Sequence, residues 1–192
     1  MKKAKRLFSL FLPVILAGVL LSGCENDLKD IQKISSREVN RPGERYTTVD
    51  VIYSDSARVK AHMTAPLMVR YAETAKPYFE MPKGVKVIFY DNNLVVTSTI
   101  TSDYAIDHEA EKTIELRKNV VATNANGDVF TSEELVWEED TKMIHSSKLV
   151  HIKFANGNIS DGTSFTSDES FNHYTMTQGT AQIHVNDQDV GH

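Results

Sequence analysis

Cysteine is almost missing from this chain of 192 residues: there is one, Cys24. A single thiol forms no internal disulfide and no site of several thiolates for a metal, so a folded domain here must be held together by its core alone. Long apolar runs are also missing, apart from residues 7–21 near the N-terminus. The apolar fraction of 41% includes that run, and the rest of the chain is therefore more polar than the average suggests.

The N-terminal segment has the order of a bacterial lipoprotein signal peptide. Four basic residues within positions 2–6 precede the apolar run, and Leu21-Ser22-Gly23-Cys24 closes it. The small residues let a peptidase approach the backbone, and the thiol accepts a diacylglycerol anchor. A membrane-spanning helix needs about 20 apolar residues, whereas this run is shorter, is interrupted by serine, proline and glycine, and ends at a cleavage-type site. We expect residues 1–23 to be removed and Cys24 to carry the lipid anchor; the alternative is an ordinary secretory signal or a short membrane anchor with a chance cysteine.

The charge balance limits the partners. Removing residues 1–23 takes away Lys2, Lys3, Lys5 and Arg6 and no acid, so the formal charge of −5 falls by four to −9. A chain this acidic is poorly suited to bind nucleic acid or to coat an anionic membrane. We expect no nucleic-acid partner, and membrane contact through the lipid on Cys24.

The mature chain divides into three parts. Residues 24–45 are polar and charged and predict a lipidated N-terminus and linker; a weak helical spacing within them is one short turn or nothing. Residues 46–185 are enough for one domain with a sizeable core. Residues 186–192 form a polar tail.

The presumed domain has the composition of β-structure almost throughout. Short segments rich in β-branched and aromatic residues alternate with turn signals about every ten residues. No segment after the signal peptide keeps a helical period over three turns. The pattern predicts an all-β fold, as an antiparallel sandwich, barrel or roll. The predicted strands are 85–90, 94–101, 113–123, 129–137, 143–154 and 174–185.

A faint internal repeat runs through the same region. The pairs Thr101-Ser102, Thr131-Ser132 and Thr166-Ser167 each open a unit of one hairpin, roughly 30 to 35 residues long. Hairpins stacked in this way bury a continuous apolar strip and leave the outermost strands unpaired. The alternative is that such pairs recur by chance in a β-rich chain.

Motifs for catalysis and metal binding are absent from the sequence. The seven histidines have no compact ligand spacing, and there is no nucleophile elbow, phosphate-binding loop or dinucleotide fingerprint. The acidic pairs Glu133-Glu134 and Glu138-Glu139 lie beside or within predicted turns, and we expect them on solvated faces. A carboxylate pair from distant parts of the chain stays open. The sequence predicts a protein that is not an enzyme and has no cofactor or metal.

Six short motifs occur in order along residues 46–185. They are Tyr53-Ser54-Asp55-Ser56-Ala57-Arg58-Val59-Lys60-Ala61, Tyr78-Phe79-Glu80-Met81-Pro82, Phe89-Tyr90-Asp91, Thr131-Ser132-Glu133-Glu134-Leu135-Val136-Trp137, Ile144-His145-Ser146 and Gly162-Thr163-Ser164-Phe165-Thr166-Ser167-Asp168. None is specific alone, but their order and spacing together resemble the LptC family, the single-anchored periplasmic component of the lipopolysaccharide export machinery.

The resemblance implies an open, V-shaped antiparallel β-jelly roll whose apolar interior receives lipid A acyl chains. It implies a non-enzymatic carrier of lipopolysaccharide that accepts lipid from an LptBFG-type inner-membrane ABC transporter and passes it to an LptA-like periplasmic bridge protein by edge-strand addition. Many family members have a transmembrane helix where this chain has Cys24. The expected location is the cell envelope on the periplasmic side, with the inner membrane favoured for the anchor and the outer membrane the alternative.

The expected groove comes partly from the resemblance and partly from the strands. Phe79 matches an aromatic position of the family's interior, and the strand pattern supplies the other members of the set. Gly162, in a predicted Gly-x-x-Phe turn, is expected to shape the C-terminal junction with the next protein. The ten predicted groove residues are Phe79, Val87, Phe89, Ile100, Ile106, Ile114, Leu116, Trp137, Ile152 and Phe165.

Two other functions stay open at this point. An envelope lipoprotein that binds another lipid or a glycan would have a closed pocket with convergent polar groups. A purely structural β-repeat protein would have a solid core and no ligand.

Overall fold

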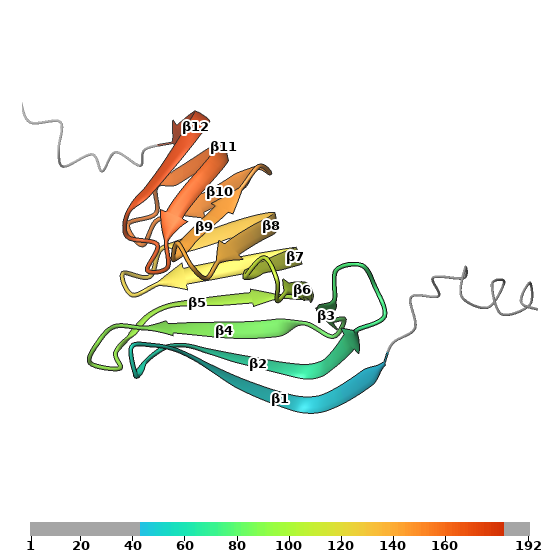
Figure 1. The fold of residues 1–192 in the computed structure, drawn as a ribbon. Coiled ribbons are helices and arrows are strands. Elements are labelled where there is room, and N and C mark those ends of the chain that lie inside the picture. Colours follow the sequence, from blue (N-terminus) through green and yellow to red (C-terminus); the bar gives the residue numbers. More distant parts are fainter. Residues whose placement is uncertain (1–42, 183–192) are drawn as a thin grey trace, which may run out of the picture. The chain divides into compact units, whose positions relative to one another are not determined.

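The structure, a computed structural model, describes residues 43–182, which form twelve β-strands and no helix. Every pair of neighbouring strands is antiparallel, and the strands form one continuous sheet (Figure 1). The predicted all-β antiparallel roll is confirmed. The strands are β1 (Glu44–Asp55), β2 (Arg58–Tyr71), β3 (Tyr78–Met81), β4 (Val85–Tyr90), β5 (Val96–Ser102), β6 (Tyr104–His108), β7 (Thr113–Asn124), β8 (Val129–Glu138), β9 (Met143–Ser146), β10 (Val150–Lys153), β11 (Ile159–Asp168) and β12 (Tyr174–Gln182).

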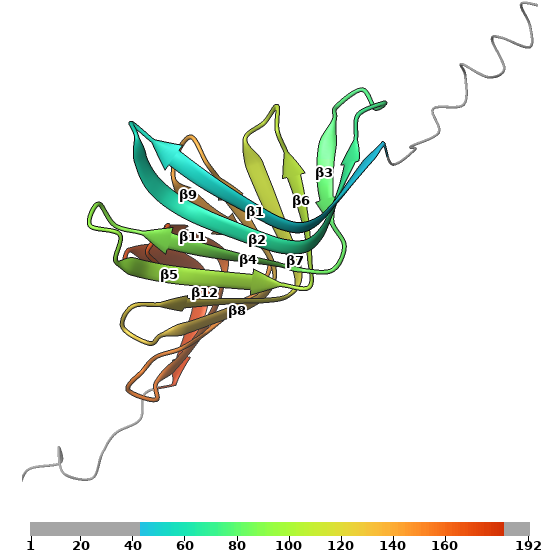
Figure 2. The same ribbon diagram turned by 90° about the horizontal axis from the view of Figure 1, so that it is seen from below.

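The sheet folds over on itself into two layers, which we call half-sheets A and B. The long strands β2, β7, β8 and β11 each pair with one short strand in half-sheet A and with another in half-sheet B. Half-sheet A contains β4, β5 and β10, and half-sheet B contains β3, β6 and β9. In Figure 2, β3 and β6 splay away from β4 and β5. The inner faces of the two layers enclose the core.

Bulges in the long strands produce the corner between the half-sheets. In β7, Lys118 and Asn119 have φ of 64° and 50° and lie between the pairs Arg117↔Glu134 and Val120↔Ser132, so that two residues oppose one. Thr48 in β1 also has a positive φ, of 55°. Bulges bend a strand and let it pass from one layer to another. Alternation of apolar and polar residues does not reveal such positions, and the corner was therefore not predicted.

The predicted strand 143–154 is wrong as one element, because the chain turns the corner within it. β9 pairs with the second half of β8, and β10 pairs with the first half. The residues between them bend, and Leu149 is left 59% exposed. The hydroxyl of Ser132 donates to the Leu149 carbonyl oxygen at 2.9 Å and holds this bend.

Other predicted boundaries shift for local reasons. The strand expected from residue 94 starts at Val96, because the Asp91 carboxylate accepts hydrogen bonds from the backbone N–H groups of Asn93 and Val95, both at 2.8 Å, and closes a turn. β1 begins at Glu44, two residues before the expected start of the domain. Cys24, the signal peptide, residues 24–42 of the linker, the end of the last predicted strand and the tail lie outside the described residues.

Gly162 lies within β11, paired with Val150, so the predicted turn is wrong. A Cβ at this position would lie 3.0 Å from the Met176 sulfur and 3.2 Å from the Thr177 carbonyl oxygen. The glycine therefore allows β12 to lie close against β11.

Two of the three Thr-Ser pairs that open the predicted repeat units lie in similar positions. Ser102 and Ser132 are both buried where their strands reach the corner, and each donates a hydrogen bond to a backbone carbonyl oxygen there. Ser167, in contrast, is buried near the far end of β11, where it donates to the His173 carbonyl oxygen. The first two pairs are structurally equivalent, and the third is not.

The C-terminal part of the core is closed by aromatic side chains. Phe130 packs against Phe165, Phe171 and Tyr174, with ring centroids 5.0–5.8 Å apart. All three phenylalanines are at most 1% exposed. Burial of each such ring contributes several kcal/mol, on the order of 3–5 when measured as the cost of removing it. This end of the roll is a solid core.

Candidate functional site

Most of the predicted groove residues are buried between the two half-sheets. Eight of the ten are at most 2% exposed on the inner faces, namely Val87, Phe89, Ile100, Ile114, Leu116, Trp137, Ile152 and Phe165. Phe79 is half-buried and borders a cavity. Ile106 faces outward, because its register partners Glu80 and Glu115 alternate with the inward Met81 and Leu116. The assignment of Ile106 to the interior is therefore corrected.

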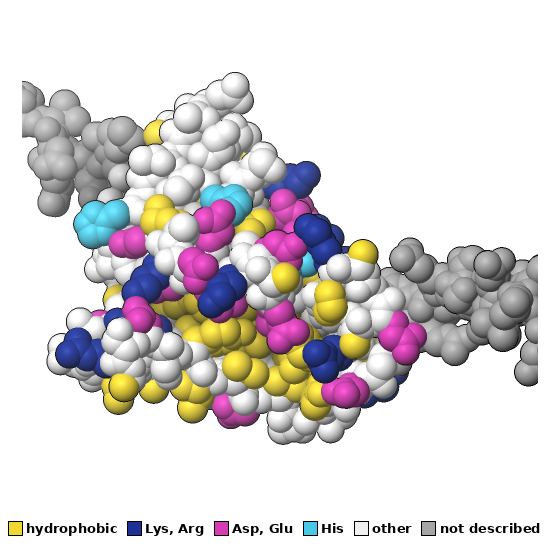
Figure 3. Space-filling model, in the orientation of Figure 1, with side chains coloured by type: hydrophobic (Ala, Val, Ile, Leu, Met, Phe, Trp, Pro, Cys, Tyr) yellow, Lys and Arg dark blue, Asp and Glu magenta, His cyan; other side chains and the backbone are white. Residues whose placement is uncertain are grey.

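The open space between the half-sheets lies at the N-terminal side of the roll. A cavity of about 380 Å³ is bounded by β1 to β3 on one side and by the β6–β7 and β8–β9 turns on the other. A second cavity of about 350 Å³ shares Tyr53, Lys112 and Glu139 with it, so the two are continuous. We call this space the trough. In Figure 3 hydrophobic side chains gather along the gap, with charged side chains around it.

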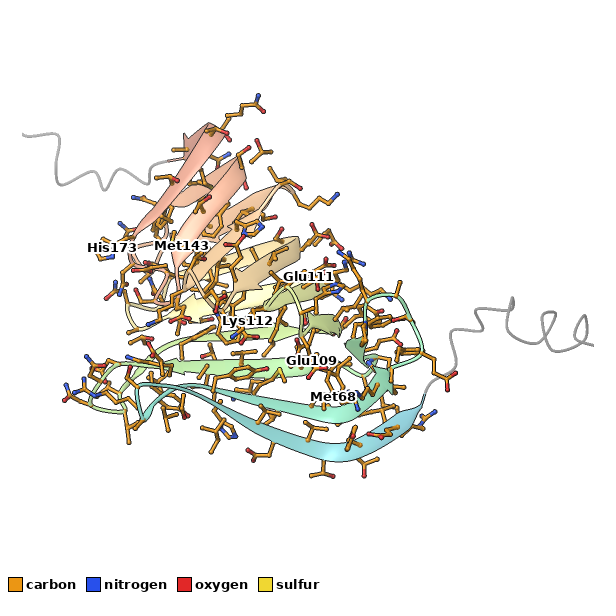
Figure 4. All side chains as sticks on the ribbon, viewed as in Figure 1. Met68, Glu109, Glu111, Lys112, Met143 and His173 are labelled. Atoms are coloured by element: carbon orange, nitrogen blue, oxygen red, sulfur yellow. The ribbon has the colours of Figure 1, made fainter. Side chains whose placement is uncertain are left out.

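The first part of the trough has an apolar floor. Register places Val51 opposite Met63, so both side chains leave the same face of β1 and β2. Met68 and Phe79 continue this surface, and Figure 4 shows Met68 beneath Glu109 and Lys112 of the β6–β7 turn. Tyr53 completes the wall, with its ring edge-on to Trp137 at 5.2 Å between centroids. An apolar lining of this size suits an aliphatic ligand.

The second part of the trough is polar, and one ion pair joins its two sides. The Lys142 ammonium lies 2.6 Å from the Asp55 carboxylate, which links the β8–β9 turn to the end of β1. A second pair, Lys112 and Asp140 at 3.6 Å, connects the β6–β7 and β8–β9 turns within one side. Asp55 and Lys142 are about half exposed, and an exposed ion pair of this kind contributes little to stability. This ion pair therefore holds the two sides of the trough together only weakly.

The β11–β12 turn closes the inner end of the trough. The Trp137 indole N–H donates to the Glu169 carboxylate at 3.0 Å, and the Asn124 amide donates to the Phe171 carbonyl oxygen at 3.4 Å. Ser98 donates to the Glu169 carbonyl oxygen. The turn is thus fixed to β5, β7 and β8, and it separates the trough from the aromatic core.

Several carboxyl groups line the trough, and two of them, Asp107 and Glu139, are partly buried. Burial, reinforced by the negative charges of Glu139 and Glu109, raises the pKa of Asp107 to about 7. Burial also raises the pKa of Glu139, against the attraction of Lys112. The solvated position predicted for Glu139 is corrected: its side chain lines both cavities.

Asp107 should make stability depend on pH. Its pKa is higher in the folded chain than the ordinary 3.8, so folding takes up a proton, and its contribution is lost as pH rises through about 7. We expect Asp107→Asn to be more stable relative to the native protein at pH 8 than at pH 5, by on the order of 1–2 kcal/mol. Urea unfolding of both proteins at the two pH values measures this difference. An equal difference at both would contradict the burial of Asp107.

A further hollow, of about 680 Å³, lies elsewhere. Asp50, Thr64 and Lys86 border it, and register places these three on the face opposite to Met63 and Val87. It is therefore an outer hollow at the corner, and it does not reach the trough. Within residues 43–182 no group of histidine and acidic side chains is arranged to hold a metal ion.

Sequence reasoning missed the residues that line the trough, apart from Phe79 and Trp137. Val51, Tyr53, Met63 and Met68 belong to strands that no turn signal delimited. Asp107 was missed because a polar residue in an alternating strand normally marks the solvent face. The hint present in the sequence was the Tyr53 motif, which the family resemblance includes.

Comparison with protein families gives one result for the whole domain. The family model described as "Lipopolysaccharide-assembly, LptC-related" matches residues 11–183. A comparison with curated individual proteins finds no match. In the described part of the chain there is no helix long and apolar enough to cross a membrane. The match spans most of the chain and agrees with the antiparallel roll, so the chain belongs to the LptC family, the non-enzymatic envelope components of lipopolysaccharide transport.

Proposed function

We propose that this protein carries lipopolysaccharide across the periplasm by holding an acyl chain in the trough. The observation that supports this most is the apolar floor of Val51, Met63, Met68 and Phe79 beside a polar second part. An amphiphile fits this gradient, with its chain on the floor and its polar portion among the charges. At roughly 30 Å³ per small group, each cavity has room for about a dozen such groups. A lipid with several chains requires the two sides to separate, and the exposed Lys142–Asp55 ion pair opposes this only weakly.

The edges of the sheet support transfer between proteins. Within the described residues β1 pairs only with β2, and β12 pairs only with β11. Such unpaired edges are templates for strand addition. We propose that an LptBFG-type inner-membrane ABC transporter supplies lipid at the β1 edge. An LptA-like periplasmic bridge protein then adds to the β12 edge, near Gly162.

The anchor completes the proposal. A diacylglycerol on Cys24 would hold the protein at one membrane, in place of the transmembrane helix of many relatives. Supply from an inner-membrane transporter favours the inner membrane, on its periplasmic side.

Site-specific photocrosslinking in living cells tests this function. A photoreactive residue at Phe79 should crosslink to lipopolysaccharide, and one at Ile106, on the outer face of the neighbouring strand, should not. Glu139 is unsuitable as a surface control, because it lines the trough. Crosslinks to a different lipid or to a glycan would replace the ligand in this proposal. Well-expressed protein with no adduct at Phe79 or Met63 would support a purely structural role instead.

A further inference from the structure

Asp107 interrupts the apolar inner face of half-sheet B. Its register partners are Phe79 on β3 and Ile114 on β7, and Ala105 precedes it on the same face of β6. All three are apolar, and Ile114 and Ala105 are fully buried. A carboxyl group at such a position costs stability unless it has a partner.

No partner for Asp107 exists among the described residues. It makes no hydrogen bond or ion pair there, and the charges that act on it are those of Glu139 and Glu109, which have the same sign. The ammonium group of Lys112, which lines the same cavity, lies 3.6 Å from the Asp140 carboxylate. A structural role as half of an ion pair is thereby excluded within residues 43–182. Asp107 is partly buried, and a carboxyl group that a cleft partly removes from water without a protein partner is a candidate ligand contact.

The hydroxyl of Tyr53 borders the same cavity and is also poorly satisfied. Its hydrogen bond goes to the thioether sulfur of Met63 at 3.9 Å, and a thioether is a weak acceptor. Asp107 lines this cavity together with Tyr53. The cavity therefore combines a donor, Tyr53, with an acceptor, Asp107, beside the apolar floor of Val51, Met63, Met68 and Phe79, while Glu109, Lys112 and Glu139 line its other side.

We propose that Tyr53 and Asp107 select an acyl chain that carries a hydroxyl group. A secondary hydroxyl can donate to the Asp107 carboxylate and accept from the Tyr53 phenol, while the rest of the chain lies on Val51, Met68 and Phe79. A plain chain would cover the same floor but leave both polar groups unpaired. This inference rests on the proposed function, and it adds to the acyl-chain site a determinant of which chains it prefers.

The expected strength of the preference for a hydroxylated chain follows from the polar groups of Tyr53 and Asp107. A site built to bond a hydroxyl rejects the analogue that lacks it, because its own buried groups stay unpaired. Burial here is incomplete, so we expect a preference of about 10- to 100-fold, at the level of one or two buried hydrogen bonds.

Competition binding tests the inference. The full-length protein in amphipol is loaded with a fluorescent fatty acid, which myristate or 3-hydroxymyristate then displaces. The native protein should bind 3-hydroxymyristate about 10-fold or more tightly than myristate. Asp107→Leu should bring the ratio close to one while plain myristate binds as well or better. Tyr53→Phe should reduce the ratio in part, and Glu133→Leu, which changes an exposed carboxylate on β8, should leave it unchanged.

The outcomes separate this inference from the function on which it rests. Equal binding of the two acids by the native protein, or an unchanged ratio in Asp107→Leu, would overturn the selection of hydroxylated chains but keep the acyl site. Failure of the native protein to bind either acid or the probe would contradict the acyl site itself. Tyr53→Phe removes one oxygen atom and keeps the ring on Trp137, so it provides a test if Asp107→Leu does not fold.

Discussion

Replacing Phe89 with aspartate should unfold the protein rather than block lipid loading. The Phe89 ring is 1% exposed and lies edge-on to Trp137, with centroids 4.9 Å apart. A charge at this position has no water and no partner, and the ring contacts are lost as well. We expect a loss of about 5 kcal/mol or more, which is comparable to the whole stability of many domains. Circular dichroism and urea unfolding of the purified variant measure it.

Phe79→Asp is the matched control for this prediction. Phe79 is also a phenylalanine on an inner face, but it is half-buried at the trough. Its variant should fold, with a loss of only about 1–2 kcal/mol, and should give fewer crosslinks to lipid from a reporter at Met63. A folded Phe89→Asp protein that still takes up lipid would mean that the core described here opens in the native protein.

Gly84→Ala should cost about 3 kcal/mol or more at the corner between β3 and β4. Gly84 has φ of +85°, which costs a residue with a side chain about 1–2 kcal/mol. A Cβ there would also lie 2.7 Å from the Ser102 carbonyl oxygen, a backbone atom that cannot rotate away. Relief requires β5 to move from β4, where the two half-sheets join. Chemical unfolding against the native protein gives the size of the loss.

Gly157→Ala separates the cost of a positive φ from the cost of the contact with the Ser102 carbonyl oxygen. Gly157 has nearly the same φ, +89°, but nothing lies within 4 Å of a Cβ placed there. This variant should therefore lose only the conformational part, about 1–2 kcal/mol. Equal losses in the two variants would show that the contact with Ser102 is relieved without cost.

The two large effects also bear on function. A solid core behind Phe89 and Phe130 means that the described structure offers lipid the trough and no passage through the whole roll. The β11–β12 turn marks the boundary, because Glu169 and Phe171 are tied to β5, β7 and β8 there. Transfer to a protein at the β12 edge would therefore require this turn to move.

Much of the fold could be predicted from the sequence, because local chemistry determines it. Residues 85–90 alternate along a strand, and Asn124 to Gly127 form a turn, whatever their neighbours are. These patterns gave the all-β class and most strand positions, and the order of the motifs gave the family. The inward orientation of the Val87, Phe89 and Ile100 side chains could be predicted, because side chains alternate between the two faces of a strand with a period of two.

What the tertiary structure alone decided was where the interior is open and which side chains face it. Opposite the bulge at Lys118-Asn119, the buried residues of β8 change from Phe130 and Ser132 to Leu135 and Trp137, so the sequence period does not carry across the corner. The inner face of β6 depends on its register with β3 and β7, which turned Ile106 outward and Asp107 inward. Whether an inward side chain meets solid core or the trough depends on strands far away in the sequence, because packing is a property of the two half-sheets together.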